Sequence, residues 1–342
     1  MPSERPGRVI LLAGGESEEH EVSLQGAQQV LAQLQERYAV QTLVISKQGA
    51  LLSPEASQLA LGNGQAPLPG PLLGRELELL KGAEVVFPLL HGPLGEDGTV
   101  QGLLRLAHLP FVGSGVLASA LCMDKAMSKQ ILGAAGLEQV RWALLTRGQF
   151  RSSPEATLEQ VQQLGFPVFI KPANLGSSVG ITKARDTGQL QLALEQAFAL
   201  DRRVIAEAMA AEHPVEIEVG VLGNDELLVS PAGEIRYPGD FYDYATKYTE
   251  GAAELVIPAE IPDAVANLAR EQAALAFSAL DCAGLARVDF FYLPESGRLL
   301  INEVNTMPGF TPTSMYPKLF EAAGLSYGAL IDRLLQLALE RR

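Results

Sequence analysis

The alternation of apolar runs and amphipathic stretches along the first third of the chain predicts a layered α/β unit. Residues 9–12, 40–46 and 84–90 are apolar enough to form buried strands. Residues 21–37 repeat apolar positions at helical spacing between the first two of these runs. Strands that alternate with helices in this way favour a parallel sheet covered by helices.

Two later regions mix the same periods. A helix is expected over residues 154–164, where Ser153 can cap the start and Gly165 can end the last turn. A strand over residues 216–221 and a long helix over residues 263–280 belong to a further unit. No internal repeat or low-complexity tract interrupts this order.

Near the end of the chain, residues 287–293 and 298–304 form two strand-like runs around the turn residues 294–297. An antiparallel register that pairs Leu293 with Leu299 would place four polar side chains on one face, because side chains two apart in a strand share a face. The four would be Arg287 opposite Asn305 and Asp289 opposite Glu303. A one-residue slip would scatter them, and the sequence leaves that possibility open.

Two carboxylates, an amide and a cation on one face suit a magnesium ion held on a nucleotide triphosphate. Mg²⁺ takes a few carboxylates and completes its shell with water and substrate phosphates. The alternative is a solvated hairpin edge with chance charges. Asp289 lies between Val288 and Phe290, and Glu303 precedes Val304. Carboxylates inside strands that look buried need a partner, which favours metal binding.

A glycine- and serine-rich segment, residues 171–180, follows the strand-like run at residues 166–170. Its backbone N–H groups can approach phosphate oxygens closely, and Lys171 adds positive charge. No Gly-Lys-Ser/Thr opens a helix here, so this is not a Walker A loop. Phosphate binding and a plain hairpin that carries an ordinary lysine both stay open.

Three smaller features each allow two interpretations. Asp124-Lys125 lies in an expected helix, where the lysine is either solvated or a nucleotide contact. The acidic residues 15–21 lead into a helix N-terminus and either complement its dipole or bind a substrate ammonium. Residues 242–248 are polar and aromatic, and form either a surface loop or a lid that closes on a site.

Composition limits the class of protein. A chain of 342 residues is too long for one ordinary core, so two or three packed units are expected. An apolar content of 47% with Gly 33 and Pro 21 is typical of a soluble, loop-rich α/β enzyme. Cys122 and Cys282 offer neither a disulfide framework nor a zinc pattern, and buried structural thiols are the favoured interpretation.

The formal net charge of −14 argues against a nucleic-acid partner. A site for an anionic nucleotide must therefore supply its own lysine, arginine and metal. The apolar run at residues 9–13 is too short for a signal peptide, and no stretch reaches membrane-spanning length. No membrane partner is expected, and a cytoplasmic location is the default.

Read together, these segments closely resemble the D-alanine–D-alanine ligases of the ATP-grasp superfamily. The matching stretches are residues 14–15, 19–23, 91–92, 95–99, 113–115, 123–125, 171–180, 216–219, 242–248, 287–289 and 303–309. They cover nearly the whole chain in order, and several are specific to this ligase family rather than to ATP-grasp proteins in general.

The resemblance implies an α/β (α+β) ATP-grasp fold with an N-terminal Rossmann-like, parallel-sheet domain over residues 1–113. A central ATP-grasp subdomain would span residues 114–207, and a C-terminal ATP-grasp and substrate domain residues 208–342, with ATP between these two. Relatives are commonly homodimers, so a homodimer is expected.

The resemblance also implies a nucleotide and metal site. ATP would be bound by Lys125, Lys171, Gly176, Ser177, Ser178, Glu207, Glu216, Lys247 and Asn302, with Glu207 at the adenine edge and Glu216 at the ribose. Two Mg²⁺ ions, for which Mn²⁺ can substitute, would be held by Asp289, Glu303 and Asn305. Ala208 departs from the family pattern next to the adenine contact. Activation by a monovalent cation such as K⁺ stays open.

For the amino-acid substrates, Glu19 would hold the ammonium of the first D-alanine within a hydrogen-bonded set with Ser177 and Tyr248. His91 would lie near that substrate's carboxylate, and Ser314 with Lys247 would receive the carboxylate of the second D-alanine. Gly309 and Met315 complete the substrate-binding residues. The catalytic residues implied are Glu19, Ser177, Tyr248, Arg287 and Ser314.

The implied function is ATP-dependent ligation of two D-alanine molecules through a D-alanyl phosphate, for peptidoglycan precursor synthesis. Tyr248 favours D-alanine over D-lactate as second substrate, because relatives that prefer D-lactate tend to replace this tyrosine. A D-alanine–D-lactate ligase or another ATP-grasp carboxylate–amine ligase is the alternative. A silent nucleotide-binding protein is disfavoured by the retained charged residues. A dinucleotide-dependent oxidoreductase is disfavoured because Gly14-Gly15 lacks the G-x-G-x-x-G pattern.

Overall fold

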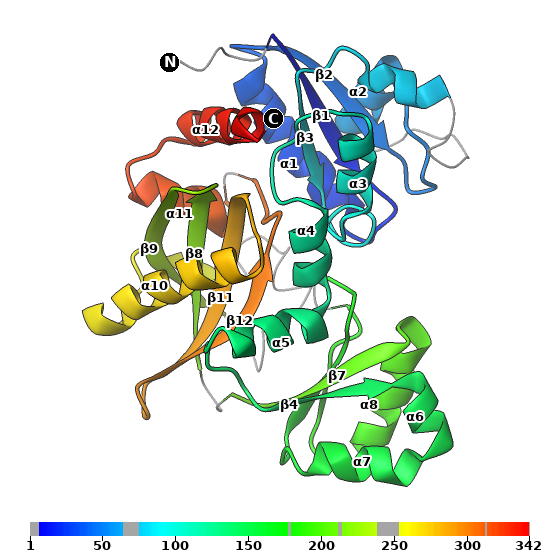
Figure 1. The fold of residues 1–342 in the computed structure, drawn as a ribbon, viewed down its shortest axis with the longest axis vertical. Coiled ribbons are helices and arrows are strands. Elements are labelled where there is room, and N and C mark those ends of the chain that lie inside the picture. Colours follow the sequence, from blue (N-terminus) through cyan, green and yellow to red (C-terminus); the bar gives the residue numbers. More distant parts are fainter. Residues whose placement is uncertain are drawn as a thin grey trace.

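Three β-sheets, each with its own helices, build the molecule (Figure 1). The computed structural model describes residues 7–63, 75–176, 179–210, 214–237, 253–311 and 313–341. In the view of Figure 1 the first sheet lies at the top, the four-stranded sheet at the bottom and the five-stranded sheet between them. None of the helices within these described ranges is both long and apolar enough to cross a bilayer.

The first sheet is parallel, as the alternating pattern predicts. Its strands are β1 (Arg8–Gly14), β2 (Ala39–Ile45) and β3 (Val85–Leu90), in the order β2-β1-β3. The accompanying helices are α1 (His20–Leu34), α2 (Pro54–Asn63), the 3₁₀ helix η1 (Arg75–Leu80) and α3 (Thr99–Leu106). Every residue of β3 is buried, which is the environment expected of a parallel strand covered on both faces.

The four-stranded sheet is antiparallel, with the order β4-β7-β5-β6. Its strands are β4 (Trp142–Thr146), β5 (Val168–Pro172), β6 (Thr182–Ala184) and β7 (Arg203–Ala208). Two helices, α4 (Val116–Met123) and α5 (Lys125–Ala134), precede it, and α6 (Arg147–Ser152), α7 (Pro154–Gln162) and α8 (Thr187–Leu200) accompany it. The predicted helix at residues 154–164 is therefore confirmed as α7, and Gly165 follows it with a φ of +83°.

The five-stranded sheet has the order β10-β9-β8-β11-β12. Its strands are β8 (Val215–Gly223), β9 (Leu227–Arg236), β10 (Glu254–Val256), β11 (Gly284–Leu293) and β12 (Arg298–Asn305). The long predicted helix is α10 (Asp263–Ala279), which buries Ala269, Ala273 and Phe277 against strands β8 and β11. Two helices end the chain, α11 (Met315–Ala322) and α12 (Tyr327–Glu340).

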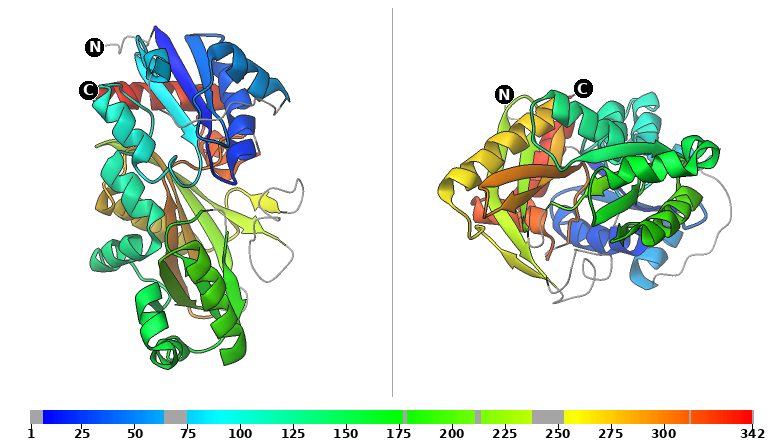
Figure 2. Two further views of the ribbon diagram at one scale, coloured as in Figure 1. Left: turned by 90° about the vertical axis from the view of Figure 1, so that its right-hand side faces the viewer. Right: turned by 90° about the horizontal axis from the view of Figure 1, so that it is seen from below.

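The last helix returns to the first sheet. Leu330, Leu334 and Leu337 of α12 share one buried cluster with Val9 and Phe87 of the first sheet. The left view of Figure 2 shows α12, in red, crossing the blue and cyan strands of the first sheet. The two ends of the chain therefore complete one core, and the first and third sheets are joined by shared burial as well as by sequence.

Candidate active site

A cavity of about 930 Å³ lies where the three sheets meet. The predicted site residues that the structure describes all line it: Glu19, His91, Lys125, Lys171, Gly176, Glu207, Glu216, Arg287, Asp289, Asn302, Glu303, Asn305, Gly309, Ser314 and Met315. They come from stretches as far apart as the start of α1 and the start of α11. The fold thus gathers residues separated by almost 300 positions into one place.

The β11–β12 hairpin forms one wall of the cavity. The predicted pairs are confirmed, because Arg287 lies opposite Asn305 and Asp289 lies opposite Glu303. The predicted pairing of Leu293 with Leu299 is wrong, since Leu293 pairs with Arg298.

The two parts of the hairpin are related by a register shift after Asp289. Phe290 pairs with Ile301, so Asn302 is one extra residue in β12. Such a bulge breaks the strict alternation of side chains. Asn302 and Glu303 are consecutive residues, and because of the bulge both line the cavity. The irregularity supplies the site with one polar side chain more than a regular strand would.

A buried charge cluster, Glu218–Arg287–Asp289, crosses strands β8 and β11. Arg287 donates from Nε to Asp289 Oδ1 and from Nη2 to Asp289 Oδ2, both at 2.8 Å, and its Nε lies 3.0 Å from Glu218 Oε2. Asn305 donates from Nδ2 to Asp289 Oδ2 at 2.9 Å. Burial alone would lower the pKa of Arg287, but Asp289 and Glu218 outweigh it and raise the pKa well above its ordinary value. The guanidinium therefore stays charged.

A second buried charge cluster, Lys129–Glu207–Lys171, borders the cavity on the side of the four-stranded sheet. Lys129 Nζ lies 2.7 Å from Glu207 Oε1, and Lys171 Nζ lies 2.5 Å from Glu207 Oε2. Burial would raise the pKa of Glu207, but the two ammonium groups outweigh it and lower the pKa to about 2. Burial opposes the charge on Lys171 too, yet Glu207 and, more weakly, Glu303 raise its pKa. Both carboxylate oxygens of Glu207 thus face lysines.

The first-sheet wall is built around Glu19, the residue that precedes α1. A Cβ added at Gly92 would lie 3.0 Å from Glu19 Oε2, and one added at Gly176 would lie 3.1 Å from the same oxygen. Gly92 also has a φ of +75°, which disfavours any side chain there. The absence of side chains at both glycines lets two backbone segments, one after β3 and one after β5, approach one carboxylate closely.

His91 and Glu96 lie beside Glu19. His91 Nε2 is buried and has no hydrogen-bond partner among the described residues. Burial lowers the pKa of His91, against the opposing effect of the Glu19 carboxylate and a hydrogen bond with the Met307 backbone. The ring is therefore biased towards its neutral form.

Glu96 is a cavity residue that the sequence reading did not single out. Its Oε2 accepts a hydrogen bond from Gly92 N at 2.6 Å. Burial and the neighbouring Glu19 carboxylate raise the pKa of Glu96 to about 8, against hydrogen bonds from Gly92 and Met307. The signal was present in the motif Gly95-Glu96-Asp97-Gly98, whose individual side chains carried no assigned role.

The remaining described residues line the edges of the cavity. Glu216 Oε1 accepts a hydrogen bond from the Tyr237 hydroxyl at 2.5 Å. Ser314 is the N-cap residue of α11, and its Oγ accepts from Thr311 N at 3.1 Å. A Cβ added at Gly309 would lie 3.0 Å from Ser314 Oγ, so a side chain there would press on this hydroxyl.

Four predicted site residues, Ser177, Ser178, Lys247 and Tyr248, lie outside the described residues. The lid expected at residues 242–248 lies outside them as well. The two cysteines are not bonded, and their sulfur atoms lie 3.7 Å apart. Cys282 is buried as expected, whereas Cys122 is only partly buried and lines the cavity.

This cavity and these three sheets belong to a known class of enzymes. A family model described as "D-ala D-ala ligase N-terminus" matches residues 8–114, and one described as "D-ala D-ala ligase C-terminus" matches residues 131–336. The chain belongs to the D-alanine–D-alanine ligase family, whose members have the ATP-grasp fold. Membership implies the use of ATP and a divalent metal, and confirms the expected fold class.

Individual relatives match over nearly their whole length. The D-alanine–D-alanine ligase of Deinococcus radiodurans is 58% identical over 336 residues, which are 98% of this chain and 99% of the relative. The VanG D-Ala:D-Ser ligase from Enterococcus faecalis has a TM-score of 0.83 at 35% identity, covering 97% of this chain and 99% of that one. The D-alanine–D-alanine ligase from Coxiella burnetii has a TM-score of 0.81 at 33% identity, with coverages of 98% and 94%.

Proposed function

We propose that this protein joins two molecules of D-alanine to D-alanyl-D-alanine at the expense of ATP, for peptidoglycan precursor synthesis. The observation that carries the proposal is the cavity that is lined by Glu19, by Glu207 and Lys171 of the Lys129–Glu207–Lys171 cluster, and by the Glu218–Arg287–Asp289 cluster. Groups for an ammonium, for phosphates and for a reacting carboxyl group therefore share one space. The 58% identity to a D-alanine–D-alanine ligase over the whole chain supports the same activity.

In the first step, the carboxylate of the first D-alanine attacks the γ-phosphorus of ATP, which gives D-alanyl phosphate and ADP. Such a step needs positioning and charge neutralisation rather than covalent help from the protein. Lys125, Lys171 and Arg287 supply positive charge for the oxygens of the transferring group. The loop that contains Gly176, Ser177 and Ser178 covers the triphosphate, while Glu207 and Glu216 serve the adenine and the ribose.

The first D-alanine is held by its charged ends. The buried carboxylate of Glu19 receives the ammonium, within a hydrogen-bonded set with Ser177 and Tyr248. His91 turns towards the substrate carboxylate. Its unpartnered, buried Nε2 supports this role, because a buried polar atom without a partner is costly unless a ligand satisfies it.

The residues proposed for the metal fit a hard divalent cation. Asp289 and Glu303 supply carboxylate oxygens, and Asn305 donates its amide nitrogen to Asp289, so its amide oxygen is the atom that can serve as a ligand. No group of three His, Cys, Asp or Glu residues in the described part of the chain forms a metal site. Mg²⁺ suits the smaller set, since it binds through one or two carboxylates plus phosphates. Two Mg²⁺ ions, replaceable by Mn²⁺, would be held by Asp289, Glu303 and Asn305 and would supply positive charge against the phosphate oxygens.

In the second step, the amine of the second D-alanine, deprotonated on binding, attacks the carbonyl carbon of D-alanyl phosphate. The carbon–oxygen bond to phosphate breaks, phosphate leaves with the proton that the attacking nitrogen gives up, and the peptide bond forms. Arg287 and backbone N–H groups near Gly309 steady the oxyanion of the tetrahedral intermediate. Ser314 and Lys247 hold the carboxylate of the second substrate, next to Met315.

An acyl phosphate hydrolyses if water reaches it, so the site must close during turnover. The segment at residues 242–248 is the proposed lid. We further propose that the protein works as a homodimer in the cytoplasm.

A second candidate is a ligase whose second substrate is not D-alanine. The D-Ala:D-Ser ligase among the similar structures favours D-serine as the first rival. Tyr248 counts against D-lactate as second substrate.

The test is substrate-resolved turnover. The protein is incubated with ATP and Mg²⁺ and with D-alanine alone or paired with D-serine or D-lactate, while ADP, phosphate and the dimeric product are followed. D-alanine alone should give ADP, phosphate and D-alanyl-D-alanine in equal amounts. Turnover that requires D-serine or D-lactate would replace the leading assignment by the corresponding ligase, and no turnover with any pair would refute both.

A further inference from the structure

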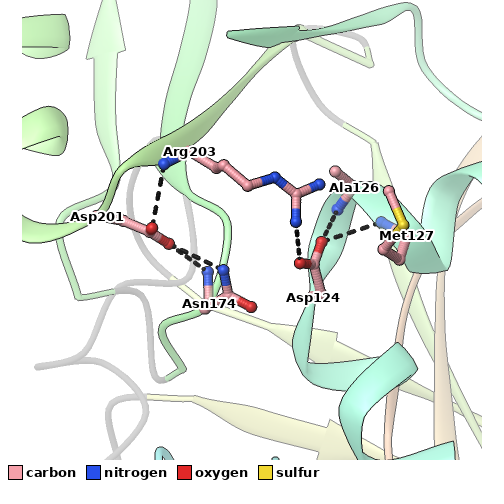
Figure 3. Close-up of polar contacts among 6 residues, drawn as sticks. All are labelled: Asp124, Ala126, Met127, Asn174, Asp201 and Arg203. Carbon is pink, nitrogen blue, oxygen red and sulfur yellow. Dashed lines mark hydrogen bonds and ion pairs between the residues drawn. The ribbon is translucent and has the colours of Figure 1, made fainter. Parts of the chain in front are cut away.

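A polar network lies beneath the glycine-rich loop, outside the cavity wall. It joins Asp124, Asn174, Asp201 and Arg203, and Figure 3 shows its hydrogen bonds and ion pairs. Neither Asp201 nor Arg203 is among the cavity-lining residues, so a role of either in the reaction must act through other residues. Nothing in the resemblance to the ligase family assigned a role to these two positions.

At one end of the network, Asp124 organises the start of α5. Its Oδ1 accepts hydrogen bonds from Ala126 N at 3.1 Å and Met127 N at 3.0 Å, which caps the helix. Its other oxygen is bound by Arg203 Nη1. Both carboxylate oxygens are thus engaged, and the next residue in the chain is Lys125, one of the two proposed phosphate lysines.

At the other end, Asp201 holds the segment that follows Lys171. Its Oδ2 accepts from Asn174 N at 2.9 Å and from Asn174 Nδ2 at 3.1 Å, while its Oδ1 accepts from Arg203 N at 3.1 Å. Ala173 N donates to Arg203 O at 3.0 Å. The backbone of Arg203 is therefore fixed to the loop through Ala173 and, by way of Asp201, through Asn174.

Lys125 completes the network with two further hydrogen bonds. Its backbone N donates to Ala173 O at 3.0 Å, and its Nζ donates to Leu175 O. The N-terminus of α5, the base of the glycine-rich loop and the start of β7 are consequently linked in a ring. Arg203 is the member that holds two sides of this ring, with its guanidinium on α5 and its backbone on the loop.

We infer that Arg203 is a positioning residue for the ATP triphosphate. This inference rests on the proposed function. Arg203 sets the spacing between Lys125 and the loop of residues 173–176, so that the lysine and the loop's N–H groups contact the same phosphates. The Arg203 side chain is 13% exposed and the Asp124 side chain 12%, so solvent screens their ion pair only weakly. An ion pair at such exposure can hold geometry that a surface pair would not.

The structure supplies a matched control for this role. Arg202 is the neighbouring residue, carries the same charge and is exposed. Arg202 takes part through its backbone, since its carbonyl accepts from Arg147 N at 2.9 Å and its N–H donates to the Asp201 carboxylate. Arg202→Met removes the same charge at the next position and keeps these backbone groups.

The experiment compares steady-state kinetics of Arg203→Met and Arg202→Met with those of the unaltered protein, together with direct titration of ADP and Mg²⁺. Arg203→Met should raise KM for ATP and the dissociation constant for ADP roughly tenfold, the usual order for a lost hydrogen bond to a charged group. KM for D-alanine should rise clearly less than KM for ATP, because Glu19 and His91 are not members of the ring and Glu19 meets the loop only at its far end, Gly176. Arg202→Met should change none of these values.

Two further variants keep the result interpretable. Arg203→Lys restores a cation without the planar fork, and it should recover part of the ATP affinity. The double variant Arg203→Met/Asp124→Asn should cost less than the sum of its single changes, because both act through one ion pair. If Arg203→Met does not fold, the comparison of Arg203→Lys with Arg202→Lys carries the test.

An ordinary structural ion pair would lower the melting temperature and leave the ratio of the two KM values unchanged, and that outcome would overturn the inference. An equal rise of both KM values would overturn it as well. Failure of the proposed function has a different signature. The unaltered protein would then bind ADP, whose titration needs no amino-acid substrate, and would fail to ligate D-alanine.

Discussion

The two buried charge clusters of the cavity each have three charged members, and their net charges are opposite. In the Lys129–Glu207–Lys171 cluster two cations share one carboxylate, whereas in the Glu218–Arg287–Asp289 cluster two carboxylates share one cation. Each group is held within a few ångströms of its counterpart, so neither cluster leaves a charge isolated. Counted over its own three members, the lysine cluster thus has one net positive charge and the arginine cluster one net negative charge.

This difference matches the two ligands of the proposed reaction. The lysine cluster, with its surplus of positive charge, suits the phosphates of ATP. The arginine cluster, with its surplus of negative charge, suits a divalent cation. The chain as a whole has a net charge of −14, so it repels a nucleotide at long range. Lys171 stays charged although it is buried, because Glu207 raises its pKa, so the site has a positive group of its own.

The largest effect is expected from breaking the arginine cluster. Arg287→Ala removes the cation from two buried carboxylates, and Asp289→Ala removes a proposed metal ligand. Each should lower kcat by about a thousandfold or more, the order seen when one preorganised charge-stabilising group is lost. ADP release measures the rate, and circular dichroism checks that the fold persists. Rates near normal in either folded variant would show that the metal and oxyanion roles are wrong.

The next effect concerns stability in the lysine cluster. Glu207→Gln leaves two buried ammonium groups with one neutral partner and should cost about 3–5 kcal/mol of unfolding free energy, the range for breaking a buried ion pair. Urea denaturation measures the loss. Glu138→Gln is the control, because its ion pair with Arg298 is exposed and should be worth less than about 1 kcal/mol. Equal losses in the two variants would show that burial does not matter here.

Acid should weaken the lysine cluster over a defined range. The pKa of Glu207 falls from its ordinary 4.5 to about 2 on folding, so the unfolded chain binds more protons between these values. The contribution of Glu207, about 3 kcal/mol, is complete above pH 4.5 and is lost as the pH falls towards 2. Urea denaturation at several pH values measures the unfolding free energy. Between pH 2 and 4.5 this free energy should depend less steeply on pH in Glu207→Gln than in the unaltered protein. An unchanged slope would contradict the low pKa.

The smallest effect should come from rebalancing the lysine cluster. Lys129→Met leaves one cation and one carboxylate, which removes the positive surplus and ties Lys171 more closely to Glu207. KM for ATP should rise about fivefold to tenfold, whereas Lys129→Arg should stay near normal, since a loss of about 1–1.4 kcal/mol corresponds to this factor. Steady-state kinetics at saturating D-alanine measure both. A KM that does not change would assign Lys129 to stability alone.

Local periodicity identified the site residues of the β11–β12 hairpin, whereas the roles of Glu19, His91, Lys125 and Ser314 came from the resemblance to the ligase family. Strand alternation placed Arg287 and Asp289 on one face, and the turn after Leu293 brought β12 back beside them. The register near that turn was wrong because the extra residue, Asn302, leaves no mark in the apolar pattern. Two consecutive polar residues, Asn302 and Glu303, were the available signal for a bulge.

The residues that were missed depend on distant partners. Lys129 lies one helical turn after Lys125 and looks like a solvated lysine, because its partner Glu207 is far away in sequence on β7. Arg203 looks equally ordinary, since its partner Asp124 precedes α5. Glu218 was within reach, because it shares a strand face with Glu216 two positions earlier.

The packing of α12 on the first sheet bears on how the protein is made. Residues 330–338 supply buried leucines to a core whose other members include Val9, Leu11 and Phe87. A ribosome delivers the chain from its N-terminus, so the first sheet emerges hundreds of residues before the helix that covers part of it. Its apolar face must stay partly exposed until α12 has been synthesised, which makes a chain broken off before α12 a target for chaperones and proteases.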